Sequence, residues 1–408
     1  MLKNFSSYLS VLGNRNFFVL IATLFIGQIA SAFLLLYLIT AVFTKTGSNF
    51  GVSGVILSLS TPAFLLMTIA GLASDILDRR RIIIITNVFI TLVVTAILVF
   101  RQDVVLLIAL SFLYFAGNSF FYPAVTAASG QLLKKKQLVD GNSIFFTTLA
   151  GGQMLGLFFA AIVQFFFENL WLLLVCEFML IVAALLPFFL PKLPPRRLAL
   201  ASVFVTLLDI FRFFRYIFSA KTILFYFFIF ASMQGVISFA ATLAPGFFDK
   251  VVGLSVEKSP LLIFPPTVLG IVSGAFFSHF KKREGFLVVF GLLVVGLATA
   301  VLGFFAGIFN AQFHLIILAT VFLFFSAIGL ICVMIASRTV IQKRIDHRYQ
   351  GSVFGANFVL SSLIATLMSP LAAGLVALFG YASVLTVAGM FFIALSIFVS
   401  MMRRKWTF

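Results

Sequence analysis

The chain has 408 residues, of which 62% are hydrophobic and only 10% are charged. So much apolar surface cannot be hidden inside a water-soluble core, which excludes a soluble globular protein. The formal net charge of +17 would fit a nucleic-acid-binding protein, but the basic residues stand in short clusters beside apolar stretches. We therefore expect no nucleic-acid partner and assign the clusters to the headgroups of membrane lipids.

Twelve apolar stretches follow one another, each close to the roughly 20 residues that a helix needs to cross the hydrocarbon of a bilayer. They lie near 17–43, 50–74, 82–100, 104–126, 143–166, 169–190, 222–247, 259–280, 285–307, 313–337, 351–378 and 380–402. The expected fold is an all-α integral membrane protein with twelve transmembrane helices.

Basic residues are distributed unevenly between the loops. If alternate loops face the cytoplasm, 24 of the 28 lysines and arginines lie on that side, and only Lys45, Arg101, Lys250 and Lys258 lie outside. The positive-inside rule then places both termini in the cytoplasm, with the chain passing many times through the plasma or inner membrane.

The chain repeats itself weakly. The run from Gly71 to Arg81 matches the run from Gly274 to Glu284 at an offset of 203 residues, although Asp75 has become Ser278. The repeat predicts two parallel halves, an amino-terminal six-helix bundle over 1–190 and a carboxy-terminal one over 222–408. Segment 191–221 would link them as an amphipathic helix on the cytoplasmic surface, or as a plain covered linker.

The run between the second and third spans carries a recognisable pattern, made up of Gly71, Asp75, Asp78, Arg79, Arg80 and Arg81. It resembles the signature loop of the major facilitator superfamily. The first half is further similar to macrolide-efflux-type drug exporters in Gly27-Gln28, Ser31, Lys45-Thr46-Gly47-Ser48, Phe120, Pro123-Ala124 and Asp140-Gly141-Asn142-Ser143. This resemblance implies two bundles around a central cavity, and transport by alternating access.

The same resemblance gives the loop a gating role. Asp75 stands where a helix meets the interface, and Gly71 would let a neighbouring helix approach closely. A carboxylate there can attract a helix amino terminus or an arginine in one conformation and release it in another. The alternative is that the basic cluster only determines topology.

Two positions depart from the exporters. Tyr114 stands where they commonly carry an arginine, and Gly156 is followed by Leu157 where they commonly carry proline. Both changes weaken the inference of proton-coupled antiport. Glu177 is the only acidic residue well inside an expected span, so it is the candidate for coupling to protons, or else a residue near the outer interface without a role.

Neutral polar and aromatic side chains are better placed to bind a substrate. The candidates near mid-membrane are Gln28, Tyr114, Asn118, Phe121, Tyr122, Gln153 and Gln234. Amides hydrogen-bond a polar group without adding net charge, and aromatic walls favour an amphipathic guest, although buried amides also serve as contacts between helices. No lysine or arginine lies mid-span, which argues against dianionic substrates.

The sequence therefore predicts a monomeric secondary transporter, without cofactor or metal, that exports an amphipathic small molecule. The closest alternative is a lipid or lysolipid carrier of the same fold. An integral-membrane lipid-modifying enzyme would need an acidic metal-binding pair or an activated nucleophile, and the one close acidic pair, Asp75 and Asp78, is followed by three arginines. A channel would need a carbonyl filter or rings of charge, which the sequence does not show.

Overall fold

The computed structural model describes residues 10–134, 137–194, 221–280, 283–309, 311–345 and 350–405. The chain forms two compact units. The amino-terminal unit comprises residues 1–46 and 58–205, and the carboxy-terminal unit comprises residues 47–57 and 206–408. One helix is therefore shared, because its first residues belong to the carboxy-terminal unit and the remainder to the amino-terminal one.

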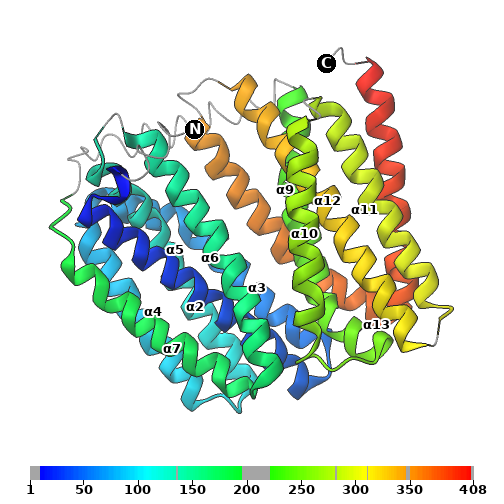
Figure 1. Ribbon diagram of the computed structural model, residues 1–408, viewed down its shortest axis with the longest axis horizontal. Coiled ribbons are helices and arrows are strands. Elements are labelled where there is room, and N and C mark those ends of the chain that lie inside the picture. Colours follow the sequence, from blue (N-terminus) through cyan, green and yellow to red (C-terminus); the bar gives the residue numbers. More distant parts are fainter. Residues whose placement is uncertain are drawn as a thin grey trace. The chain divides into compact units, whose positions relative to one another are not determined.

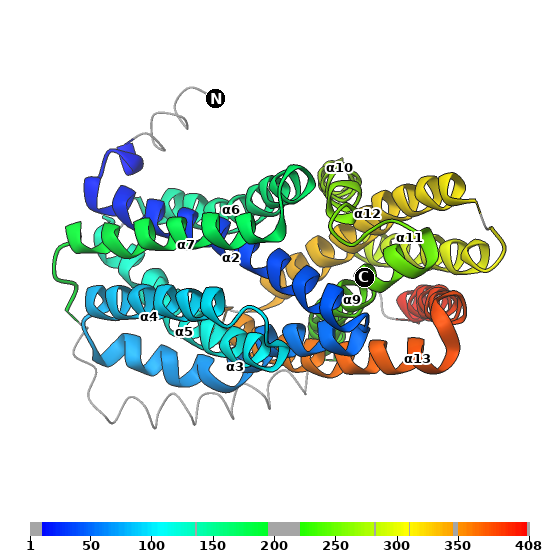
Figure 2. The same ribbon diagram turned by 90° about the horizontal axis from the view of Figure 1, so that it is seen from below.

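The amino-terminal unit is built from helices that follow the predicted apolar stretches. They are α2 (Arg15–Thr46), most of α3 (Asn49–Ile76), α4 (Arg79–Val99), α5 (Val104–Leu132), α6 (Leu138–Phe166), α7 (Asn169–Leu185) and the short 3-10 helix η2 (Leu186–Phe189). Helix α2 packs against α5, α6 and α7, and α4 packs against α5 and α7 (Figure 2).

The carboxy-terminal unit follows the same plan. Its helices are α9 (Lys221–Phe247), the π-helical turn η3 (Phe248–Val252), α10 (Ser259–Phe280), α11 (Glu284–Ala306), α12 (Gln312–Arg344) and α13 (Gln350–Lys405). Helix α13 is broken at Gly380, whose φ of 75° and ψ of 166° are not helical. The chain reverses direction there, between the orange and red parts of α13 (Figure 1).

Eleven helical segments of the described chain are long and apolar enough to cross a bilayer, and the last of them, Ala356–Met402, contains the break at Gly380. Every predicted span thus falls on a helix. The largest difference in boundary is at α12, which continues to Arg344, seven residues beyond the expected end. Lys343 and Arg344 lie in its last turn, where cations are favoured by the helix dipole, so the helix continues into the polar interface.

Small residues set the closest helix contacts. A Cβ at Gly156 of α6 would lie 2.7 Å from Ala32 Cβ and 2.8 Å from Ile29 Cα of α2. In the other unit, a Cβ at Gly296 of α11 would lie 2.7 Å from the backbone nitrogen of Ile393 in α13. Glycine allows these backbones to touch, as is common in membrane helices. The predicted surface helix at 191–221 falls almost wholly on residues 195–220, which lie outside the described residues.

Candidate functional site

Gln28 and Tyr122 form a hydrogen-bonded pair between α2 and α5. The amide nitrogen of Gln28 donates to the hydroxyl of Tyr122 over 2.8 Å. Only 6% of Gln28 is exposed, and Tyr122 is half-buried. Close packing holds the pair, since a Cβ at Gly152 of α6 would lie 2.8 Å from Gln28 Cβ. The structure thus brings together two candidates from separate helices.

Tyr114 and Asn118 lie one turn apart on α5. Asn118 is buried and donates from Nδ2 to the carbonyl of Tyr114 over 3.2 Å. The Tyr114 side chain is fully buried, and its hydroxyl has Ser31 and Asn118 as polar neighbours. That hydroxyl makes no hydrogen bond of good geometry to any described residue. A buried hydroxyl without a hydrogen bond costs folding free energy. The Tyr114 hydroxyl is such a group, and it lies beside the Gln28–Tyr122 pair.

Three other candidates lie elsewhere. Phe121 is buried in the hydrophobic core of the amino-terminal unit, where its ring meets that of Tyr122 edge to face at 5.7 Å. Gln153 is half-buried on α6, next to Gly152. Gln234 is exposed on α9, in the other unit. The polar cluster is therefore defined by Gln28, Ser31, Tyr114, Asn118 and Tyr122.

Arginines of the signature loop bind helix ends. Arg79, 5% exposed, donates from Nε to the carbonyl of Ser74 over 3.2 Å, close to the carboxyl end of α3. Arg80 donates from Nη2 to the carbonyl of Phe188 over 2.8 Å, in η2. A helix carboxyl end carries free carbonyls and partial negative charge, so both arginines stabilise such an end. Arg81 is exposed.

The acidic residues of the loop have different surroundings. Asp78 caps α4, because its Oδ1 accepts a hydrogen bond from the backbone N–H of Arg81 at 3.3 Å. Asp75 is half-buried near the end of α3 and pairs with no described residue. Its carboxylate, like the exposed side chain of Arg81, therefore makes no contact that stabilises the described part of this unit.

The close helix approach expected at Gly71 is not observed. A Cβ there would meet no atom within 4 Å, whereas a Cβ at Gly274, its counterpart in α10, would lie 2.9 Å from the carbonyl oxygen of Ile328 in α12. Ser278, which replaces the aspartate, donates to the carbonyl of Gly274 over 2.8 Å. The second copy of the loop is thus tightly packed, while the first copy leaves open space beside its glycine.

Glu177 of α7 forms a polar contact with α4. Its Oε1 accepts from the hydroxyl of Thr95 at 2.6 Å, and its Oε2 is buried without a partner among the described residues. The preceding residue, Cys176, is the one that lies near Tyr114. Glu177 is therefore directed to the α4–α7 contact rather than into the polar cluster.

A second polar group was missed by the sequence analysis. In the carboxy-terminal unit, Lys250 donates to the carbonyl of Gly47 over 2.8 Å, and Asn49, at the start of α3, bonds to Tyr381. Asparagine directly before an apolar helix is a common helix-start signal, but its partner lies too far along the sequence to be foreseen. Within the described chain, no group of three metal-ligating side chains is found.

Solved transporter structures share this fold. A mutant of the nucleoside transporter NupG superposes with a TM-score of 0.75 over 95% of this chain and 100% of that chain, at 13% sequence identity. The POT family transporter PepTSo gives a TM-score of 0.74 over 96% of this chain and 98% of that chain, at 11% identity. A POT family transporter in complex with 5-aminolevulinic acid gives 0.72 at 11% identity, covering 97% of each chain. The search of curated proteins finds no match.

The sequence itself matches a family description over most of its length. The model of the Major Facilitator Superfamily covers residues 17–368, from the beginning of α2 into α13. This agrees with the resemblance of the signature loop and with the solved transporters, and it indicates a transporter rather than an enzyme. The chain belongs to the Major Facilitator Superfamily.

Proposed function

We propose that this protein is a secondary transporter that exports an amphipathic small molecule by alternating access. The observation that carries the proposal is the buried polar cluster around the Gln28–Tyr122 hydrogen bond, which lies on membrane-spanning helices and contains no charged side chain. Amide and phenol groups can hydrogen-bond a polar substituent, while the surrounding aromatic rings accept an apolar body.

The members of the cluster have different proposed roles. Gln28 and Tyr122 bond to each other and can exchange that bond for one to a substrate. Tyr114 is fully buried, so we assign it to packing beside Ser31 and Asn118 rather than to direct contact with the substrate. The solved nucleoside and peptide transporters support small organic solutes in general, and at their low identity they do not select a substrate.

We also propose twelve spans with cytoplasmic termini in a plasma or inner membrane. Helix α13 supplies two of these spans, because the break at Gly380 divides a segment too long for one crossing. A cysteine introduced at Gly253, in the turn after η3, should react with an impermeant reagent from outside intact cells. Labelling only after permeabilisation would contradict the arrangement.

Transport is tested with purified protein in liposomes that contain a fluorescent amphipathic dye, under an imposed pH gradient. We expect dye efflux from wild-type vesicles, and at least a tenfold lower rate for Gln28→Leu. The matched control is Gln164→Leu, which removes a similarly buried amide hydrogen-bonded to Asn169 instead of Tyr122. Equal rates for both variants would overturn the assignment of the site.

The second candidate is a lipid or lysolipid carrier. The large apolar cavity of the carboxy-terminal unit favours this alternative, because apolar chains fit where polar solutes do not. Measuring the movement of headgroup-labelled lysolipid in the same vesicles distinguishes the lipid carrier from the exporter of small molecules. Movement of the lysolipid without movement of dye or other solutes would replace the first proposal with the second.

A further inference from the structure

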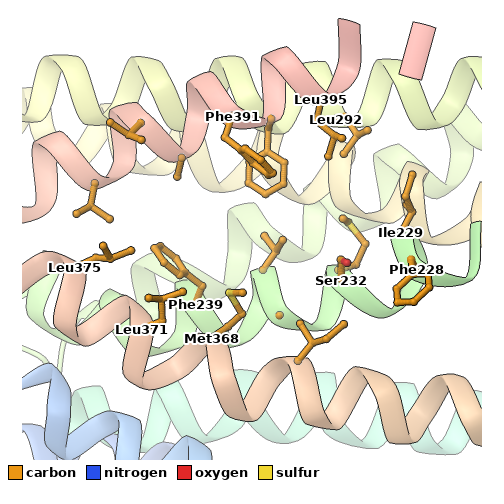
Figure 3. Close-up of a pocket in the computed structure, with 18 of the residues that line it drawn as sticks. Phe228, Ile229, Ser232, Phe239, Leu292, Met368, Leu371, Leu375, Phe391 and Leu395 are labelled. Carbon is orange, nitrogen blue, oxygen red and sulfur yellow. The ribbon is translucent and has the colours of Figure 1, made fainter. Parts of the chain in front are cut away.

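A cavity of about 1200 Å³, open along one side, lies between helices of the carboxy-terminal unit. It is bounded by α9, by both halves of α13 and by Leu292 of α11. Phe228, Ser232 and Phe239 approach it from α9, with Met368 and Leu371 from the first half of α13 and Phe391 from the second (Figure 3). All the lining residues belong to one unit, so the cavity is separate from the polar cluster of the amino-terminal unit.

The lining is almost wholly apolar. Ser232 and Ser383 supply its only polar side chains, and none of its side chains is charged. Water is not a stable occupant of such a space, since it would lack the two to four polar partners that a buried water needs. An empty cavity of this size would forgo the dispersion contacts of its walls. The natural occupant is therefore apolar.

The cavity is long as well as large. Its lining runs along α9 from Leu224 to Phe239, which corresponds to about 22 Å at the rise of an α-helix. Half the hydrocarbon thickness of a bilayer is about 15 Å. An extended acyl chain lying parallel to α9 would fit this length.

Two tight contacts hold the cavity open. Gly235 brings α9 against the first half of α13, where a Cβ would lie 3.1 Å from Met368 Cγ. Gly389 brings the second half of α13 against α11, where a Cβ would lie 2.6 Å from Ala300 Cα. The second half meets α9 at its start, where the ring of Tyr381 contacts that of Phe247, and the cavity lies between the two helices beyond that contact.

The amino-terminal unit has no such separation, because α2 and α7, its first and last spans, pack directly against each other. In the carboxy-terminal unit, large side chains that line the cavity are left uncovered by protein. Val387 is 65% exposed and Phe391 is 62% exposed. These side chains lie within a predicted span, so what covers them comes from the bilayer.

We propose that this cavity holds one acyl chain of a membrane phospholipid as a bound constituent of the protein. The site does not depend on the proposed export of small molecules, and it differs from the site of a lipid carrier because the lipid stays bound. The bound lipid fills the space between α9 and the second half of α13 and completes the packing of the carboxy-terminal unit.

The test uses wild-type protein in liposomes of phosphatidylcholine and phosphatidylglycerol with a small fraction of phosphatidylcholine carrying a mid-chain diazirine. After illumination, mass spectrometry maps the modified residues. We expect labelling of the peptides covering 224–239 and 383–395 to exceed labelling around Leu92 of α4 at least fivefold. Leu92 is 64% exposed and serves as an ordinary lipid-facing position. Labelling no higher than at Leu92 would overturn the proposal.

Ser232→Trp should fill the cavity and lower this labelling at least fivefold. The matched control is Ile237→Trp, on the same helix but outside the lining, which should leave the labelling unchanged. If Ser232→Trp does not give a monodisperse protein, Val387→Trp fills the cavity from the opposite wall. Native mass spectrometry of delipidated protein gives an independent readout: one retained phospholipid in wild type and none in the filled variant support the proposal, and equal retention overturns it.

Discussion

Asn49 donates a hydrogen bond from Nδ2 to the hydroxyl oxygen of Tyr381 over 2.8 Å. Asn49 begins α3, and Tyr381 follows the break in α13 at Gly380. Gly246 of α9 lies beside both, and a Cβ there would overlap the Tyr381 hydroxyl and the Asn49 amide. Three helices far apart in sequence thus meet at one polar contact of the carboxy-terminal unit.

A double-mutant cycle with Asn49→Leu and Tyr381→Phe should give a coupling free energy of about 0.6 kcal/mol, the average for hydrogen bonds between membrane helices. The Tyr381→Phe change keeps the ring contact with Phe247, whose centroid lies 6.0 Å away. Unfolding in mixed detergent micelles gives the free energy of unfolding of the wild type, the two single variants and the double variant. A coupling of zero would show that the contact contributes nothing to stability.

Asp75→Asn should lower transport sharply with little change in folded yield, because the Asp75 carboxylate stabilises no described contact in this conformation. A tenfold population shift toward the inward-open form corresponds to about 1.4 kcal/mol, which one interfacial ionic contact can supply. Disulfide cross-linking between introduced cysteine pairs measures that shift. The control is Asp78→Asn, which removes a charge but keeps an oxygen to cap α4. Wild-type transport in Asp75→Asn would reduce the loop to a determinant of topology.

Arg80→Ala should destabilise the protein by about 1 kcal/mol, because the carbonyl of Phe188 loses a charged donor at a helix end. Arg81→Ala is the matched control, since that side chain is exposed. Thermal unfolding in detergent compares the two variants. Equal melting temperatures would show that the bond of Arg80 to η2 has no net effect.

Gly156→Ala should lower the free energy of unfolding by about 1–3 kcal/mol, because the added Cβ would press on the backbone of α2 at Ile29. Gly151→Ala, five residues earlier on α6, should be neutral or stabilising, since its Cβ would meet nothing within 4 Å. Gly71→Ala should also be tolerated in this conformation for the same reason. Thermal unfolding in detergent compares the three variants, and an equal loss of stability at all three positions would contradict this packing.

Coupling to protons is one of the two roles that the sequence leaves open for Glu177. In that role, Glu177→Gln should abolish accumulation driven by a pH gradient while leaving downhill exchange intact. Glutamine mimics the protonated acid and can keep the contact with Thr95. Thr95→Val is the control, because it removes the hydroxyl that bonds to Glu177 but leaves the Glu177 carboxyl in place, so uphill accumulation should persist. Uphill transport by Glu177→Gln with unchanged pH dependence would leave Glu177 with a structural role at the α4–α7 contact.

The helices were predictable because a spanning helix must be about 20 apolar residues long, and each stretch met that condition. The basic cluster of the loop was also visible, but its contacts were not. That Arg80 reaches the carbonyl of Phe188 depends on η2 lying beside α4, which follows from packing rather than local sequence.

The close helix approach expected at Gly71 is absent from this structure and stays a prediction, for a related reason. Gly71 and Gly274 occupy equivalent positions in the repeat, yet only Gly274 has a helix pressed against it. A repeat predicts which residues correspond, not how tightly each copy packs. Gln28 and Tyr122 were each predicted as substrate-binding candidates, but the sequence could not show that these two side chains bond to each other.

Helix α3 is shared between the two units, and this has a consequence during synthesis. Asn49 precedes its partner Tyr381 by 332 residues. At a translation rate of about 5–20 residues per second, roughly 20–70 seconds pass before that partner leaves the ribosome. Val52 and Val55 of α3 are fully buried in the finished protein and belong to the carboxy-terminal unit, most of whose residues are synthesised after them. The first turns of the second membrane helix are thus made early and gain their bond to Tyr381 late, after most of the carboxy-terminal unit has been synthesised.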